Sequence, residues 1–234
     1  MSHRPFDAVV FDLFGTLVFE FERDAFHGSI AAMAERLGAD PAGFLEAWNA
    51  TAFERQTGSF ATVEDNVRAI CRSLGARAPS DTAMAEGLEP RAAMYRRWFR
   101  PRSGSIETLR ELRARGYPVA MISMCAPDAP AMWRASALAP LVDVAVFSCE
   151  VRLRKPDPAI YLAATEGLGV RPGRTLYCGD GAYGELSGAT GVGMKAYLLR
   201  DPSVDADDQL VPDREQGWTG PVVADLRELL DLLP

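Results

Sequence analysis

Polar side chains that can take part in hydrolysis follow apolar segments at four places in the sequence. In chain order they are Asp12 and Thr16, then Ser123, then Lys155, and finally Asp180 and Glu185. A carboxylate can serve as a nucleophile, an ammonium group can offset anionic charge, and further carboxylates can bind a divalent cation. Each residue alone is typical of a helix cap or a surface group. The ordered set predicts a common site with one nucleophile candidate, a hydroxyl, a lysine and two further carboxylates.

The elements that must position this set are strands that alternate with helices. Apolar strands are predicted at 6–11, 118–122, 142–147, 175–178, 194–199 and 221–223, and helices at 106–115, 128–135, 156–168, 183–189 and 225–233. This alternation is typical of an α/β fold with a doubly wound parallel sheet. Ligands of such sheets bind beyond the carboxyl ends of the strands, where the polar set stands.

The segment between the first and second strands has a different pattern. Its apolar residues recur at intervals of three and four, which is the spacing of helices, and we expect four or five helices there and no strand. Residues 18–100 are therefore predicted to form a helical cap domain, inserted into a core domain of residues 1–17 and 101–234. The acidic, proline-containing stretch 201–216 has no periodicity and is predicted to be a surface loop.

Composition restricts the class of protein. The 234 residues carry a net charge of −7 without a basic block, which argues against a nucleic-acid partner. No apolar run is long enough to span a membrane, and the N-terminus lacks the pattern of a secretory signal. Lys155 and Lys195 are the only lysines, which indicates a coding bias toward arginine, so most arginines need no functional explanation. The four cysteines, Cys71, Cys125, Cys149 and Cys178, form no paired motif, which favours reduced thiols in a cytoplasmic protein.

Four motifs in this order resemble those of the haloacid dehalogenase-like (HAD) superfamily of hydrolases. They are Asp12-Leu13-Phe14-Gly15-Thr16-Leu17, the serine of Met121-Ile122-Ser123, Lys155 in Arg154-Lys155-Pro156, and Gly179-Asp180-Gly181 followed by Glu185. The first motif alone is a weak indication of the family. All four motifs in order, with a helical insertion between the first and second, are a specific one. The resemblance covers essentially the whole chain, and the insertion is similar to the C1-type cap of that family.

The resemblance implies a role for each motif. Asp12 would be the nucleophile, Lys155 would offset negative charge, and Thr16 would order the turn beside the nucleophile. Ser123 and the amides of the first motif would hydrogen-bond the transferring oxygens. The ligands implied for Mg²⁺ are Asp12, the main-chain carbonyl of Phe14, Asp180 and Glu185, and the residues expected at the substrate are Leu13, Phe14, Gly15, Met124, His27 and Arg55.

Phe14 departs from the phosphatase pattern, in which a second aspartate stands at this position as general acid and base. General acid–base catalysis contributes about 10²–10⁴-fold to a rate. Phe14 therefore leaves four interpretations open. They are a good leaving group such as an acyl phosphate, a proton from another residue such as His27 in the cap, a different reaction, and ligand binding without turnover.

The different reaction would be that of haloacid dehalogenases, which carry an aromatic residue where Phe14 stands, attack carbon and use no metal. Two features oppose it, because Gly179-Asp180-Gly181 has the metal-binding form and Met124 stands where those enzymes have asparagine. Arg23 and Arg55 are the options for a halide-binding arginine. The phosphonate-cleaving branch needs a cap lysine for a Schiff base, and the predicted cap contains none.

The sequence therefore favours a Mg²⁺-dependent hydrolase that acts on a small phosphorylated metabolite through an aspartyl-phosphate on Asp12. One alternative is a metal-independent 2-haloacid dehalogenase with the same nucleophile. The other is a degenerate domain that binds a ligand without turnover. The expected partner is a small-molecule substrate, and the expected assembly is a monomer or a homodimer.

Overall fold

A parallel sheet forms the centre of the fold. The structure is a computed structural model, and it describes residues 4–19, 21–202, 210, 215 and 217–234. The strands of its six-stranded sheet are β1 (Ala8–Asp12), β2 (Val119–Ser123), β3 (Val144–Phe147), β4 (Thr175–Gly179), β5 (Lys195–Leu199) and β6 (Val222–Val223). They lie in the order β3-β2-β1-β4-β5-β6, and each neighbouring pair is parallel. The predicted α/β fold with a parallel sheet is confirmed.

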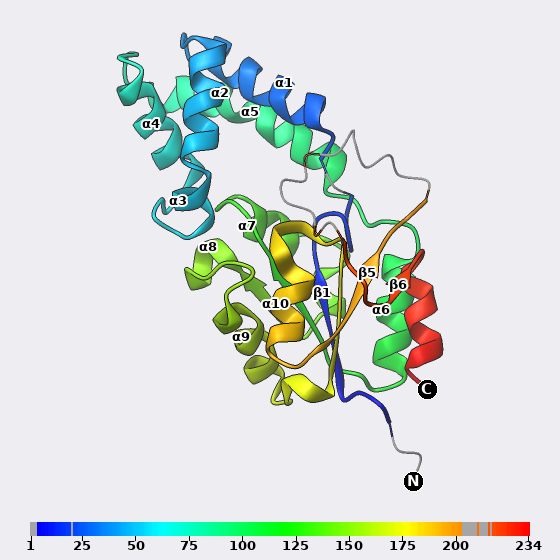
Figure 1. Cartoon of the computed structure of the whole chain (residues 1–234). Helices are drawn as coiled ribbons and strands as arrows, with labels where there is room; N and C mark the ends of the chain where they lie inside the picture. Colours follow the sequence, from blue (N-terminus) through cyan, green and yellow to red (C-terminus); the bar gives the residue numbers. More distant parts are fainter. Residues whose placement is uncertain (1–3, 20, 203–209, 211–214, 216) are drawn as a thin grey trace.

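Helices cover both faces of the sheet (Figure 1). Those outside the cap are α6 (Ser105–Ala114), α7 (Ala129–Arg134), α8 (Ser148–Val151), α9 (Pro158–Leu168) and α10 (Glu185–Gly191), with short 3-10 helices at Ala139–Leu141, Pro172–Arg174, Ala182–Gly184 and Leu226–Leu232. Successive β1 residues point to opposite faces. Val9 and Phe11 pack with α6, α7 and the C-terminal 3-10 helix, whereas Val10 packs with α9 and α10. Burial on both faces explains the continuous apolar run of the strand.

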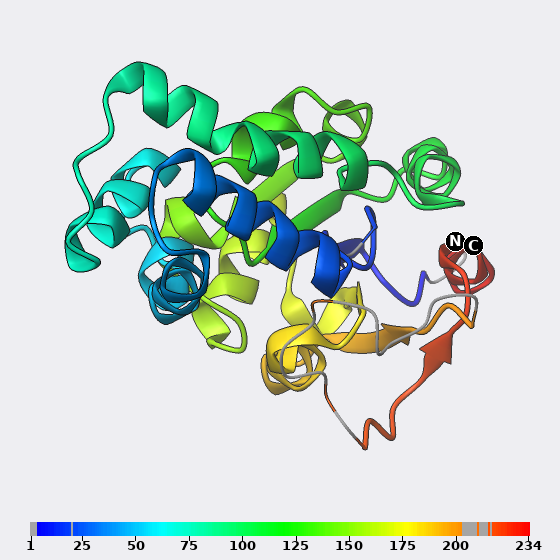
Figure 2. The same cartoon turned by 90° about the horizontal axis from the view of Figure 1, so that it is seen from above.

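Five helices between β1 and α6 form a layer above the carboxyl ends of the strands (Figures 1 and 2). They are α1 (Arg23–Arg36), α2 (Pro41–Ala50), α3 (Ala52–Gln56), α4 (Val63–Ser73) and α5 (Asp81–Trp98). Ile30, Phe44, Trp48 and Val67 are buried in a hydrophobic cluster of this layer that is separate from those of the sheet. Because the nucleophile candidate ends β1, this arrangement places the helical layer over it.

Two connectors join the helical layer to the sheet, and they run side by side. Val18 pairs with Pro101 in an antiparallel bridge, and the Phe19 amide donates to the Arg100 carbonyl at 3.3 Å. The Leu17 carbonyl accepts from the hydroxyl of Ser105 at 2.8 Å. The start and end of the inserted segment are therefore held together at one place.

Most predicted elements agree with the observed ones within two residues; one helix begins later than predicted for a local reason, and one differs in kind. The helix predicted at 183–189 begins at Glu185, because Gly181 and Gly184 have positive φ and break the chain into a short 3-10 turn first. The helix predicted at 225–233 is a 3-10 helix at Leu226–Leu232. The loop predicted at 201–216 lies mostly outside the described residues. No helix in the described part of the chain combines the length and the apolar character that crossing a bilayer requires.

Candidate active site

Asp12 stands at the carboxyl end of the central strand β1 and is only 6% exposed. Its Oδ1 accepts a hydrogen bond from Nζ of Lys155 at 2.5 Å. Its buried Oδ2 has no hydrogen-bond partner among the described residues. Burial and the negative charge of Glu185 raise the pKa of Asp12 well above its ordinary value, although Lys155 opposes the shift. One carboxylate oxygen is thus held in place while the other is left for a ligand.

Lys155 is the buried cation of the site, with 1% of its surface exposed. Its ammonium lies between Asp12 and Glu185, with 2.5 Å from Nζ to an oxygen of each. Burial by itself would lower the pKa of Lys155, but the two carboxylates outweigh burial and raise that pKa above its ordinary value. The lysine therefore keeps its charge and orients the nucleophile candidate.

Glu185 is fully buried at the start of α10, and both of its carboxylate oxygens are occupied. Oε1 accepts from the Gly181 amide at 2.9 Å, and Oε2 accepts from the Tyr177 hydroxyl at 2.7 Å as well as from Lys155. A Cβ at Gly179 would lie 2.1 Å from Oε1, so only glycine fits there. These contacts make Glu185 an anchor for Lys155 and leave it little capacity to bind a metal directly.

Asp180 follows β4 and faces the loop after β1. Its Oδ1 accepts from the Ala182 amide at 3.0 Å. A Cβ at Gly15 would lie 2.3 Å from Oδ2 of Asp180, and Gly15 has a φ of +81°, so the close approach depends on glycine. Asp12, Asp180 and Glu185 each offer an oxygen within 4.8 Å of the others. The orphaned Oδ2 of Asp12 and the adjacent Asp180 fit a small oxygen-seeking cation such as Mg²⁺.

The two hydroxyl candidates lie near the nucleophile candidate, Asp12. Ser123 is the last residue of β2, is fully buried, and comes one position after the residue paired with Asp12. Thr16 is also fully buried, and its amide donates to the Leu13 carbonyl at 3.3 Å, which closes the turn after β1. Leu13 itself packs into the hydrophobic core rather than toward a cavity.

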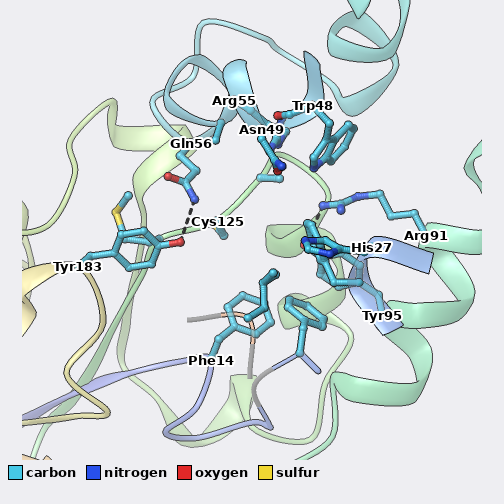
Figure 3. Close-up of a pocket in the computed structure, with 16 residues that line it drawn as sticks. Phe14, His27, Trp48, Asn49, Arg55, Gln56, Arg91, Tyr95, Cys125 and Tyr183 are labelled. Carbon is cyan, nitrogen blue, oxygen red and sulfur yellow. Dashed lines mark hydrogen bonds between the residues drawn. The ribbon is translucent and has the colours of Figure 1, made fainter. Parts of the chain in front are cut away.

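A cavity of about 340 Å³ lies between the sheet and the helical layer (Figure 3). Four residues expected at the substrate line it, namely Phe14, Met124, His27 and Arg55, whereas Leu13, Gly15 and Arg23 do not. Across the opening, Nε2 of Gln56 in α3 donates to the hydroxyl of Tyr183 at 3.2 Å, so the two layers touch above the site.

Phe14 belongs to an aromatic cluster at the base of this cavity. Its ring centroid lies 5.0 Å from that of Phe21, 6.3 Å from that of Tyr95 and 5.8 Å from that of Phe99. The side chain therefore supplies an apolar wall where a second carboxylate would otherwise stand. It has no proton to give to a leaving group.

Two arginines of the helical layer reach the upper wall of the cavity. Arg55 and Arg91 lie over the Trp48 ring, with Cζ 3.9 Å and 4.9 Å from its centroid. Arg91 pairs with Asp128 at 2.6 Å, but its Nη1 has no hydrogen-bond partner among the described residues. Arg55 donates to the Trp48 carbonyl and to Asn66 at 2.9 Å and forms no ion pair with a described residue. Burial and the charge of Arg91 lower the pKa of Arg55 to about 9. The wall therefore carries an excess of positive charge.

Sequence reasoning missed three residues that support the site. Arg91 is one of them. Arg102 donates from Nη1 to the Gly15 carbonyl at 2.7 Å and from Nη2 to Asp201 at 2.7 Å. Glu215 accepts from the amides of Leu186 and Ser187 at the start of α10, at 2.8 and 2.9 Å. No motif or periodicity marks these residues, because their partners are distant in the sequence.

Comparisons with known proteins agree with this architecture. A family model described as haloacid dehalogenase-like hydrolase matches residues 6–193. (S)-2-haloacid dehalogenase 4A of Burkholderia cepacia is 26% identical over 97% of this chain and 94% of its own length. Phosphatase MT3486 of Mycobacterium tuberculosis is 36% identical over 45% of this chain and 48% of its own length. The crystal structure of a HAD phosphatase from Thermococcus onnurineus superposes with a TM-score of 0.65 at 21% identity and covers 97% of both chains. Proteins named for both chemistries are thus among the matches.

Proposed function

Because the chain belongs to the haloacid dehalogenase-like hydrolases, we propose that it is a Mg²⁺-dependent phosphatase that uses Asp12 to cleave a small phosphorylated compound. The charge of the site carries this proposal. Three carboxylates, those of Asp12, Asp180 and Glu185, surround a single ammonium group. An anionic substrate would meet net negative charge there, and a divalent cation is the group that removes this obstacle.

The residues that would hold Mg²⁺ are Asp12 through Oδ2, Asp180, and the main-chain carbonyl of Phe14. Glu185 would support these ligands without binding the ion itself, since its oxygens already accept hydrogen bonds from Lys155, Tyr177 and Gly181. When bound, the cation would offset the charge of the phosphoryl oxygens and keep Asp12 ionised. Glu185 belongs to the metal set expected from sequence, and its proposed part there is to hold a water bound to the ion.

The reaction proceeds in two steps. Asp12 attacks phosphorus, a bond forms between its oxygen and the phosphoryl group, and the bond to the leaving oxygen breaks. Water then attacks the aspartyl-phosphate and releases inorganic phosphate. Lys155 holds the nucleophile in position throughout, and its charge offsets that of the transferring group. Ser123, at the end of the neighbouring strand, would donate a hydrogen bond to that group.

Phe14 restricts the leaving group. No carboxyl stands at its position to protonate the departing oxygen, and its ring packs with Phe21, Tyr95 and Phe99. The substrates expected to react fastest are those whose leaving oxygen departs as a stable anion, such as acyl or aryl phosphates. His27 lines the same cavity and is the side chain that would donate a proton to a poorer leaving group.

A dehalogenase is the second candidate, and two observations favour it. The wall formed by Phe14 is apolar, and Arg55 and Arg91 provide a site for an anion opposite. The relative that matches over nearly the whole chain is named a 2-haloacid dehalogenase. In that reaction Asp12 would attack carbon and displace halide, and water would then hydrolyse the ester.

The deciding experiment measures phosphate release from p-nitrophenyl phosphate and halide release from 2-haloacids, each with Mg²⁺ and with EDTA. Asp12→Asn is the control for both, and Asp180→Asn is the control for the metal. The proposal requires phosphate release that needs Mg²⁺ and is lost in both variants. Halide release that persists in EDTA would establish the dehalogenase instead, and turnover in neither assay would favour a binding domain.

A further inference from the structure

Two thiols outside the reacting groups face each other between β2 and β3. Cys125 follows β2, is 3% exposed and lines the cavity between the sheet and the helical layer. Cys149 lies in α8, directly after β3, and is half-buried. Their Sγ atoms are 3.8 Å apart. The two cysteines are distant in sequence, and the parallel pairing of β2 with β3 is what brings them together.

Ser148 fixes the backbone that carries both thiols. Its Oγ accepts from the Cys125 amide at 3.0 Å, and the residue is fully buried next to Cys149. A disulfide requires about 2 Å between the sulfur atoms, so side-chain rotation and a small shift of backbone must close a gap of about 1.8 Å. The hydrogen bond from Ser148 keeps the two segments in register for this closure.

The two thiols differ in access and in acidity. Cys149 lines a second cavity of about 240 Å³, together with Gly58 and Phe60 of the cap segment. The hydrogen bond with Cys125 lowers the pKa of the Cys149 thiol, whereas burial raises the pKa of Cys125. Burial also raises the pKa of Cys71 and Cys178, and neither of these has a cysteine neighbour among the described residues. Cys149 is thus the reachable thiol and Cys125 its resolving partner.

We propose that Cys125 and Cys149 form a redox pair, which peroxides oxidise to a disulfide in the folded protein and dithiols reduce again. This goes beyond the hydrolytic function and holds for either reaction at Asp12. The Cys149 thiolate attacks one oxygen of the peroxide, the O–O bond breaks, and a sulfenic acid and hydroxide form. The Cys125 thiol then attacks that sulfur, and water leaves as the S–S bond forms. The thiols lose two electrons, which reduce the peroxide.

The disulfide would join the wall of the substrate cavity to the place where the cap touches the core. A Cβ at Gly58 in the cap would lie 2.4 Å from the Cys149 carbonyl, so the two surfaces are already in close contact there. Because Cys125 lines the cavity, oxidation should change turnover, and reduction with a dithiol should restore the starting rate.

The test treats the native protein with hydrogen peroxide and follows it by intact mass, peptide mapping and thermal melting. The expected results are the loss of two hydrogens, a peptide joining Cys125 to Cys149, and reversal by dithiothreitol. Because the link closes a loop between the two positions, the oxidised protein should melt about 5 °C higher or more. The Cys149→Ser variant should show neither change, and Cys71→Ser should behave as the wild type.

Several results would overturn the proposal. One is a cross-link that forms only in denaturant. Another is oxidation of Cys149 to a sulfinic acid or a mixed disulfide while Cys125 stays free, and a third is an oxidised protein that melts no higher than the reduced one. None of these readouts needs the protein to be catalytically active. A failed activity assay therefore bears on the proposed function alone.

Discussion

Replacement of Lys155 by methionine removes the ammonium group that lies between two buried carboxylates, those of Asp12 and Glu185. In the wild type its ammonium lies 2.5 Å from an oxygen of Asp12 and 2.5 Å from one of Glu185. Methionine keeps the approximate volume but no charge. Because both carboxylates are almost fully buried, the loss leaves negative charge that neither solvent nor protein offsets.

The expected cost follows from the geometry. Oxygens of Asp12 and Glu185 lie within 4.8 Å, so at an effective dielectric constant of about 20 their repulsion is about 3.5 kcal/mol. Removal of one partner from a buried ion pair generally costs about 3–5 kcal/mol. We therefore expect Lys155→Met to lower the free energy of unfolding by about 3–5 kcal/mol at pH 8. At lower pH the carboxylates take up protons, and the deficit should shrink. Turnover should be lost at all pH values.

Urea unfolding in EDTA, followed by tryptophan fluorescence at pH 8 and pH 5, measures this effect. The chain offers a matched control, because Lys195 is the only other lysine and is exposed on β5. Lys195→Met should change stability by less than about 0.5 kcal/mol. A Lys155→Met deficit below about 1 kcal/mol at pH 8 would refute the reasoning, as would a deficit that does not change with pH.

Three further predictions concern the same site. Burial and the charge of Glu185 raise the pKa of Asp12 in the folded protein, so the ionised carboxylate destabilises the fold at a pH above that raised pKa. Asp12→Asn should therefore have a higher melting temperature than the wild type in EDTA at pH 8. The difference between the two melting temperatures should narrow as the pH falls to 4. Mg²⁺ at a hundredfold excess over Kd should raise the melting temperature of the wild type by about 5 °C or more and leave Asp180→Asn unchanged. Phe14→Asp should increase hydrolysis of alkyl phosphates relative to p-nitrophenyl phosphate, measured as the ratio of kcat/KM, and should lower stability by about 2 kcal/mol because it breaks the contact with Phe21.

The position of these polar side chains at one edge of the sheet was predictable from sequence. Asp12, Ser123 and Asp180 end or follow apolar runs, and parallel strands bring their carboxyl ends to one edge whatever the loops do. The same rule predicted that Lys155 would join them. Local patterns were sufficient here because strand direction, rather than side-chain packing, decides where these residues lie.

The supporting contacts were not predictable in this way. The coding bias toward arginine suggested that most arginines have no special role, yet Arg91 and Arg102 are both buried. Their significance depends on partners that only the folded chain supplies, such as the Trp48 ring for Arg91 and the Gly15 carbonyl for Arg102. The hydrogen bonds that occupy both carboxylate oxygens of Glu185 could not be predicted from sequence for the same reason. A motif identifies a carboxylate but not the donors that surround it.

The side-by-side connectors determine how the cap can move. Val18 and Pro101 pair in one antiparallel bridge, and the Phe19 amide donates to the Arg100 carbonyl, so the two connectors are held to each other. Any rotation of the helical layer against the sheet would therefore move both connectors together. Arg102, which directly follows the second connector, donates a hydrogen bond to the Gly15 carbonyl. Gly15 lies in the loop after β1, two residues before Leu17, where the first connector begins. Such a rotation would also move the loop that carries Asp12, so the position of the helical layer and the orientation of the Asp12 carboxylate would be coupled.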